Sequence, residues 1–148
     1  MRIRPYRHKV DQAAVLAVFD RAFPSAHPFL EGTGHFEGAR EVVEQALPYW
    51  DAFVAREKTK AAGFIIVRND GHIAALFVDA PLRNRGVGTE LLKAAQNLHQ
   101  KLTLQVFEEN RFALRFYQSR GFQVIDGERA IDSRGTGHYR LTLTSSPP

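Results

Sequence analysis

The chain has 148 residues, of which 44% are hydrophobic and 24% charged, a balance typical of a globular chain with one good core. It contains no cysteine, which excludes disulfide bonds, thiolate metal ligands and a cysteine acyl-enzyme. No apolar run is long enough to span a bilayer, and the N-terminal residues lack the apolar stretch of a signal peptide. We therefore expect a single cytoplasmic domain covering residues 1–148, with no membrane partner.

The net charge of +4 and the pI near 9.7 make the chain mildly basic. No run of lysine and arginine with interleaved aromatic residues occurs, so we expect no nucleic-acid partner. An anionic small ligand explains the basic charge equally well, because part of that charge is concentrated in one segment, at Arg83, Arg85, Lys93 and Lys101.

Periodicity in the first half of the chain predicts one strand, two helices and three further strands. The strands are expected at residues 2–6, 49–56, 62–68 and 72–78, and the helices at 12–23 and 37–47. Asp11 can cap the first helix, and Pro24 is expected to end it. Asn69-Asp70-Gly71 is a strong hairpin turn signal.

The second half predicts a helix at 87–99, a strand at 102–107, a helix from Asn110 to Gly121, and strands at 122–125 and 138–143. The resulting order, βααβββαβαββ, indicates the α/β (α+β) class. We expect a mixed, largely antiparallel central sheet of about seven strands, flanked by about four helices. The strand–helix–strand unit in the middle predicts one parallel pair.

A glycine-containing turn joins the strand at 72–78 to the following helix. Its residues are Arg83, Asn84, Arg85, Gly86, Val87, Gly88 and Thr89. Glycine lets backbone N–H groups approach a ligand closely, and a helix N-terminus adds unpaired donors and a positive dipole end. These features predict a pyrophosphate cradle. The glycine spacing fits neither a P-loop nor a dinucleotide fingerprint, and an ordinary turn before a helix is the alternative.

The spacing Arg83-x-x-Gly86-x-Gly88 resembles the coenzyme A loop of the GNAT N-acetyltransferase superfamily. A second segment, with Asn110, Ala113, Tyr117 and then Gly-Phe, resembles the superfamily pattern Asn-x-x-Ala-x-x-x-Tyr-x-x-x-Gly-Phe. Within the superfamily the chain is similar to small bacterial YjaB-like members. The resemblance implies a GNAT fold and acetyl transfer from acetyl-CoA to a primary amine by direct attack in a ternary complex. A non-catalytic acyl-CoA-binding module and a nucleotide-binding protein are the alternatives.

The resemblance also implies which residues contact coenzyme A. Backbone N–H groups of residues 85–89 would hold the pyrophosphate, and the main chain of Phe77 and Val78 would follow the pantetheine arm and polarise the thioester. The implied contacts are Phe77, Val78, Arg83, Asn84, Arg85, Gly86, Val87, Gly88, Thr89, Asn110, Ala113 and Phe116. Solvated surface explains the arginines equally simply, and helix capping explains Asn110.

Tyr117 matches the superfamily's general acid, although an aromatic residue packed in the core is the alternative. His72 stands where many members carry a glutamate base, and its alternative is an exposed histidine at a hairpin end. A chain of ordered water is the second candidate for the base.

The loop between the first two helices is where the superfamily builds its acceptor site, which implies roles for His27, Phe29 and Glu31; a variable loop is the alternative. His27 and His35 on one loop are insufficient for a metal site, so no metal is expected. The acceptor is expected to be a small-molecule or peptide amine. Pairing of two copies through a sheet edge is compatible with this architecture.

Overall fold

The computed structural model describes residues 1–82, 85–125, 130–133 and 135–144. Its elements are β1 (Arg2–Pro5), α1 (Gln12–Ala26), the 3-10 turn η1 (Pro28–Leu30), α2 (His35–Ala46), β2 (Asp51–Glu57), β3 (Lys60–Val67), β4 (Ile73–Val78), the 3-10 turn η2 (Ala80–Leu82), α3 (Val87–Gln96), β5 (Lys101–Phe107), α4 (Arg111–Ser119), β6 (Gln123–Val124), β7 (Ala130–Ile131) and β8 (Gly137–Thr144). The predicted order is confirmed, with β7 as an additional short strand.

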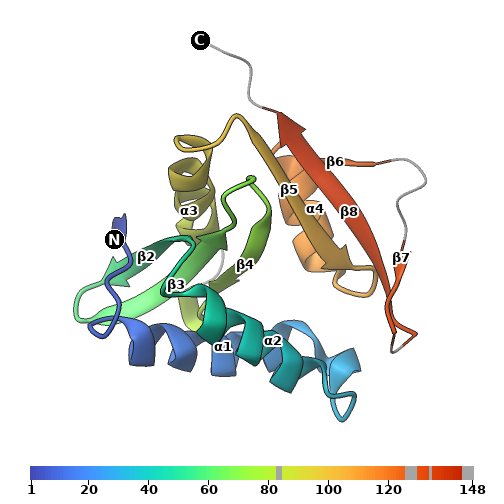
Figure 1. Ribbon diagram of the computed structural model, residues 1–148, viewed down its shortest axis with the longest axis horizontal. Coiled ribbons are helices and arrows are strands. Elements are labelled where there is room, and N and C mark those ends of the chain that lie inside the picture. The colour runs from blue at the N-terminus through green and yellow to red at the C-terminus, as the bar shows by residue number, and fades with distance from the viewer. Residues whose placement is uncertain (83–84, 126–129, 134, 145–148) are drawn as a thin grey trace.

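The central sheet consists of two halves that diverge from each other (Figure 1). Strands β1, β2, β3 and β4 form an antiparallel half-sheet in that order, and β8 pairs with β5 on one side and with β6 and β7 on the other. Among the described residues, the parallel contact between the halves is a single bridge from His72 to Thr103. The predicted parallel pair is therefore confined to one end of β4 and β5.

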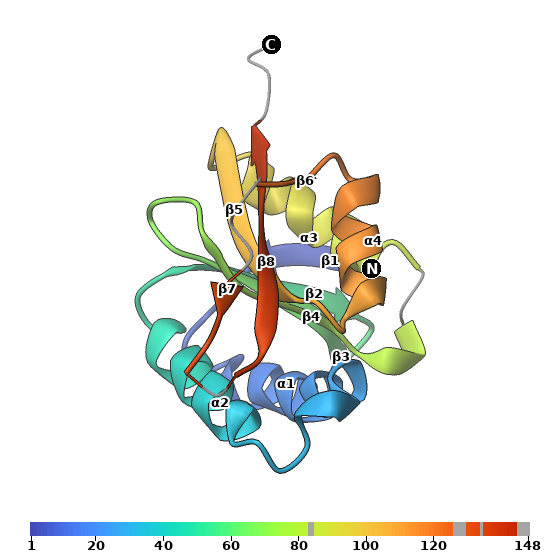
Figure 2. The same cartoon turned by 90° about the vertical axis from the view of Figure 1, so that its right-hand side faces the viewer.

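Helices cover both faces of the sheet, α1 and α2 on one face and α3 and α4 on the other (Figure 2). Side chains of β3 alternate between two cores because successive residues of a strand point to opposite faces. Phe64 and Ile66 pack with α1 and α2, whereas Ile65 and Val67 pack with α3. Among the described residues, no helix is long and apolar enough to cross a membrane.

The beginning and the end of α1 differ from the sequence prediction. The carboxylate of Asp11 does not cap the helix; it receives two hydrogen bonds of 2.7 Å from the Arg4 guanidinium and one from the Arg7 N–H. Pro24 lies inside the helix, so the prediction that it ends α1 was wrong. A proline removes only one intrahelical hydrogen bond, and the buried Phe23 anchors this last turn in the core.

Candidate active site

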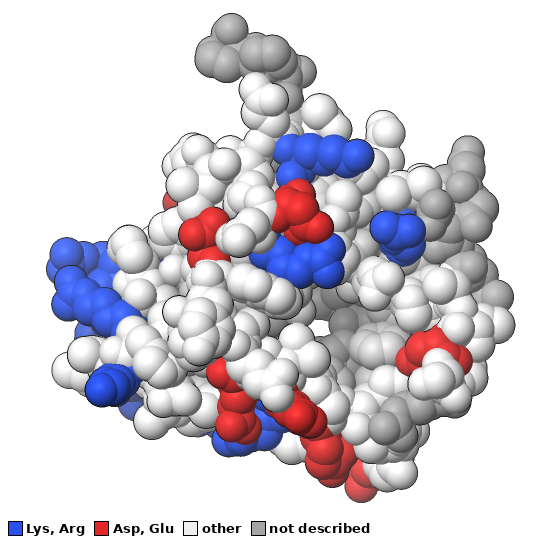
Figure 3. Space-filling view, in the orientation of Figure 1, with Lys and Arg blue, Asp and Glu red and all other residues white. Residues whose placement is uncertain are grey.

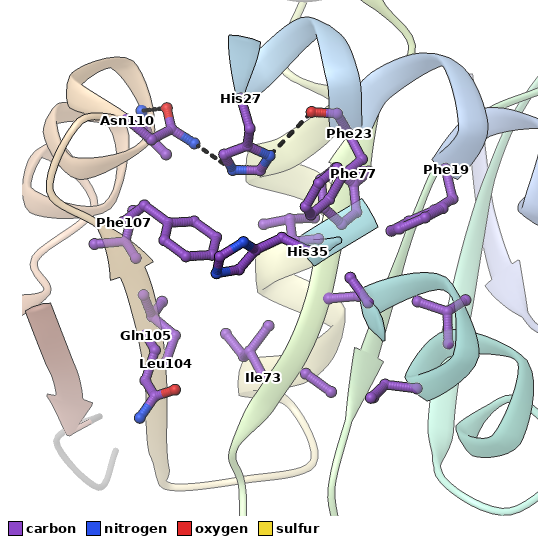
Figure 4. Close-up of a pocket in the computed structure, with 18 of the residues that line it drawn as sticks. Phe19, Phe23, His27, His35, Ile73, Phe77, Leu104, Gln105, Phe107 and Asn110 are labelled. Carbon is purple, nitrogen blue, oxygen red and sulfur yellow. Dashed lines mark hydrogen bonds between the residues drawn. The ribbon is translucent and has the colours of Figure 1, made fainter. Parts of the chain in front are cut away.

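The divergence of β4 from β5 creates two pockets that meet inside the sheet. The first, which we call the α2 pocket, has a volume of about 400 Å³ and is lined from α1, α2, β4 and β5 (Figure 4). The second, the α3 pocket, has a volume of about 760 Å³ and is lined from η2, the start of α3, β4 and α4. Both pockets are lined by Leu76, Phe77, Asn110, Ala113 and Tyr117. Two ligands entering from opposite sides of the sheet would meet at these residues.

The predicted pyrophosphate cradle forms one wall of the α3 pocket. Gly86 adopts a φ of 79° and precedes the first turn of α3, whose N-terminus has no side-chain cap. The N–H groups of Val87, Gly88 and Thr89 therefore have no intrahelical acceptor, and these residues line the pocket. A Cβ on Gly88 would lie 3.1 Å from the Phe116 ring. Free donors at a positive dipole end fit a pyrophosphate.

Of the two arginines predicted to assist this cradle, the structure describes only Arg85. Arg83 and Asn84 lie outside the described residues. Arg85 is exposed and does not line the α3 pocket. Arg120, at the end of α4, does line it, and sequence reasoning missed this residue. Its position eight residues after the pocket-lining Phe112 was the available signal, since residues at this spacing share one helix face.

The edge of β4 that faces β5 offers main-chain groups to the pockets. The Asp79 N–H donates to the Ala62 carbonyl at 2.8 Å, so the main chain of Asp79 points toward β3. Because strand residues alternate in direction, the main chains of Val78 and Leu76 point into the gap between the half-sheets. Phe77 directs its carbonyl toward Gly63 of β3 and lines both pockets. Val78 and Leu76 thus provide the main-chain groups expected along a pantetheine arm.

Tyr117 lies where the two pockets meet. Its side chain packs against Phe116 and Phe122, and only 8% of the residue is exposed. Within the described part of the chain its hydroxyl has no hydrogen-bond partner, although the residue lines both pockets. Burial raises the pKa of the Tyr117 hydroxyl, so the phenol remains protonated at neutral pH. A protonated, unpartnered hydroxyl is suited to donate a proton to a ligand.

Asn110 and His27 form a polar bridge across the gap. The side-chain oxygen of Asn110 accepts from the Ala113 N–H at 3.2 Å, which confirms the predicted helix cap. Its Nδ2 donates to Nε2 of His27 at 3.1 Å, and Nδ1 of His27 donates to the Phe23 carbonyl at 3.0 Å (Figure 4). This pattern assigns the neutral Nδ1–H tautomer to His27. The bridge joins the end of α1 to the start of α4.

A second bridge was not foreseen from the sequence. His35, the first residue of α2, lies 2.8 Å from the Asp132 carboxylate through Nε2 and 2.7 Å from the Thr33 hydroxyl through Nδ1. His35 also lines the α2 pocket and packs edge-on against Phe107. Because 97 residues separate His35 from Asp132, no local pattern could indicate their contact.

His72 is placed apart from Tyr117. Its Nδ1 lies 2.8 Å from the Thr103 hydroxyl, at the end where β4 and β5 touch, and it lines neither pocket. Burial lowers the pKa of its imidazole. Phe29 packs edge-on against His27 and Phe107 without lining either pocket, and Glu31 is exposed. Of the three predicted acceptor residues, only His27 lines the α2 pocket.

Comparison with known proteins identifies relatives along nearly the whole chain. The family described as acetyltransferase (GNAT) domain matches residues 21–143. Peptidyl-lysine N-acetyltransferase YjaB of Salmonella typhimurium is 32% identical over 142 residues, covering 95% of each chain. The solution structure of apo YjaB from Escherichia coli superimposes with a TM-score of 0.80, at 28% identity and 98% coverage of each chain. PaiA N-acetyltransferase from Thermoplasma acidophilum, solved with coenzyme A, superimposes with a TM-score of 0.77 at 16% identity, covering 97% of this chain and 99% of its own.

Proposed function

The chain belongs to the acetyltransferase (GNAT) family and acetylates an amine with acetyl-CoA, and we propose that this amine is a lysine side chain of a polypeptide. The meeting of the two pockets at Tyr117 is the observation that carries the proposal. The YjaB relatives, which are named as peptidyl-lysine acetyltransferases, support the choice of acceptor. A non-catalytic binding module would need no second pocket.

The α3 pocket would hold the acetyl-CoA. The N–H groups at the start of α3 bind the pyrophosphate, while the main chains of Leu76 and Val78 hold the pantetheine arm. Bound there, the cofactor supplies a thioester whose carbonyl carbon is open to attack by an amine. A main-chain N–H from the free edge of β4 stabilises the negative charge that develops on the carbonyl oxygen.

Tyr117 would act as the general acid. The amine nitrogen forms a bond to the carbonyl carbon as the carbon–sulfur bond breaks, and the departing sulfur takes the phenolic proton. The tyrosinate then recovers a proton from solvent. Burial raises the pKa of the phenol, which keeps Tyr117 protonated before the transfer and favours the return of a proton to the tyrosinate afterwards.

The acceptor would enter through the α2 pocket. Its walls are largely apolar and suit the methylene stem of a lysine (Figure 4). No aspartate or glutamate is among the described residues that line this pocket, so we propose that water carries away the amine proton. His72 remains a predicted base, located at the closed end of the gap.

The surroundings of the α2 pocket suit a cationic acceptor. Helix α2 contributes one wall of the pocket and carries Glu37 and Glu41, both exposed and without an ion pair among the described residues. Figure 3 shows acidic side chains along the edge of the molecule formed by α2. Because the whole chain carries a charge of +4, this acidic edge is the local feature that would attract a lysine-containing segment.

An acetylation assay with matched amines tests the proposal. The panel consists of a peptide with a blocked N-terminus and one lysine, the same peptide with norleucine in place of lysine, a peptide with a free N-terminus and no lysine, and spermidine. We expect the kcat/KM of the lysine peptide to exceed that of the other amines by about tenfold or more. A tenfold ratio corresponds to about 1.4 kcal/mol of transition-state stabilisation. A preference for spermidine or for the free N-terminus would refute the lysine assignment.

A variant that fills the α2 pocket tests the route of the acceptor. Val42 lines this pocket and is half exposed, so Val42→Trp should fold and obstruct the entrance. We expect a higher KM for the lysine peptide and an unchanged Kd for acetyl-CoA. Val10→Trp, at an exposed site outside both pockets, is the matched control. An unchanged peptide KM in Val42→Trp would place the acceptor elsewhere.

A further inference from the structure

Arg120 stands out among the cationic side chains near the α3 pocket. Among the described residues it is the one lysine or arginine that lines this pocket. Its Cζ lies 6.0 Å from the centroid of the Phe116 ring, a cation–π distance. The same ring lies against Gly88, at the start of α3. The guanidinium is therefore separated from the pyrophosphate cradle by the width of one aromatic ring.

The charges around Arg120 leave it available for an anion. It forms no ion pair with any residue that the structure describes. The carboxylate of Glu90 also lines the α3 pocket, but it lies 3.3 Å from the Lys93 ammonium. Among the described residues, the pocket wall thus presents one guanidinium without an ion pair and one carboxylate that already has a cationic partner.

Helix α4 ends at Arg120, beyond the residues that line the meeting point of the two pockets. Asn110, at the start of this helix, and Tyr117 both line the meeting point of the two pockets. Arg120 follows Asn110 by ten residues and Tyr117 by three, which correspond to about 15 Å and about 4.5 Å along a helix. Coenzyme A is an extended molecule with its thiol at one end, the pyrophosphate in the middle and a 3′-phosphate on the ribose at the other end. A cation beyond the pyrophosphate cradle suits that terminal phosphate.

We propose that Arg120 binds the 3′-phosphate of the adenosine of acetyl-CoA, and that it gives the site its preference for coenzyme A over 3′-dephospho-coenzyme A. The inference rests on the use of the α3 pocket for acetyl-CoA. Main-chain N–H groups at the start of α3 bind any phosphate that reaches them. A guanidinium held over an aromatic ring adds a planar pair of charged donors at a second place, and only a ligand with a second phosphate gains from it.

Calorimetric titration with acetyl-CoA and with 3′-dephospho-acetyl-CoA tests this role without reference to catalysis. The wild-type chain should bind acetyl-CoA about tenfold or more tightly than the dephospho form. Arg120→Met should reduce this ratio to about one and leave the affinity for the dephospho form unchanged. Arg115→Met removes an exposed arginine of the same helix that lines neither pocket, and should keep the wild-type ratio. Arg120→Lys should restore part of the preference.

The possible outcomes separate this inference from the assignment of the cofactor. Equal weakening of both ligands by Arg120→Met would assign the contact to the pyrophosphate and overturn the proposal. An unchanged ratio with unchanged affinities would also overturn it, because Arg120 would then make no contact. Failure of the wild-type chain to bind either ligand would contradict the use of acetyl-CoA itself.

Discussion

The two pockets are built from different parts of the polypeptide. The α3 pocket uses main-chain groups for its central contacts, at the free edge of β4 and at the start of α3. The α2 pocket is defined by side chains, among them His35 of α2, Phe77 of β4 and Phe107 of β5. The α3 pocket, built from main-chain groups, therefore depends on a few contiguous residues. The α2 pocket, built from side chains, depends on how distant elements pack. Replacement of side chains can therefore change the acceptor while the cofactor site is retained.

The residues shared by both pockets connect these two kinds of site. Tyr117 belongs to both, and the Asn110–His27 bridge holds the start of α4 against the end of α1. Changes at shared residues should therefore affect catalysis or stability most strongly, and changes confined to one pocket should affect only one ligand.

The largest effect is expected from Tyr117→Phe. Loss of the general acid should lower kcat by about 10²- to 10⁴-fold. The Kd for acetyl-CoA and the free energy of unfolding should stay unchanged, because the hydroxyl has no hydrogen-bond partner among the described residues. Steady-state kinetics with Tyr49→Phe as an exposed control measure this difference. An unchanged kcat in Tyr117→Phe would remove the acid assignment.

Asn110→Ala should lower the free energy of unfolding by about 3 kcal/mol, because it removes a helix cap and the hydrogen bond to Nε2 of His27. Asn110→Ser keeps a capping oxygen and loses only the bridge, so its loss should be smaller. Urea unfolding of both variants separates the two contributions. Equal stability of wild type and Asn110→Ser would show that the bridge contributes nothing.

Gly88→Val should act on the α3 pocket alone. The new side chain would press on the Phe116 ring at the entrance to the cradle and obstruct the approach to the N–H groups, so we expect acetyl-CoA binding to be weaker by about tenfold or more. Gly38→Ala is the control in the α2 pocket, because a Cβ there meets no atom within 4 Å. Calorimetry should show weaker binding only for Gly88→Val, and a wild-type Kd for this variant would contradict the cradle.

The smallest effect is expected from His72→Gln. Since burial lowers the pKa of His72 in the folded chain, the unfolded chain binds more protons as the pH falls through about 6.5. The wild-type free energy of unfolding should therefore decrease below this pH, and His72→Gln should lack that part of the decrease. If water is the base, the acidic limb of the pH profile of kcat/KM should be the same in the wild type and in His72→Gln. A shift of this acidic limb in His72→Gln would establish His72 as the base.

Sequence reasoning predicted the features that depend on neighbouring residues. The order of the elements, the cap by Asn110 and the end of α4 just before Gly121 follow from local patterns. The prediction failed at Pro24, because burial of the surrounding turn outweighs one lost hydrogen bond.

The missed site residues all depend on tertiary packing. The His35–Asp132 contact forms between segments far apart in the chain, and β7 forms only by pairing with β8. Arg120 follows the recognisable pattern around Tyr117 but reaches the α3 pocket only because Phe116 packs on Gly88. Helical spacing places Arg120 on the same face of α4 as Phe112, but that spacing does not show that this face borders the α3 pocket.

The most direct test of the central claim is a set of initial rates with acetyl-CoA and a lysine peptide, each varied at several fixed concentrations of the other. Two pockets that meet at Tyr117 require both substrates to be bound together, so the double-reciprocal lines should intersect. Parallel lines would show an acetylated enzyme intermediate and would contradict direct transfer between the two pockets.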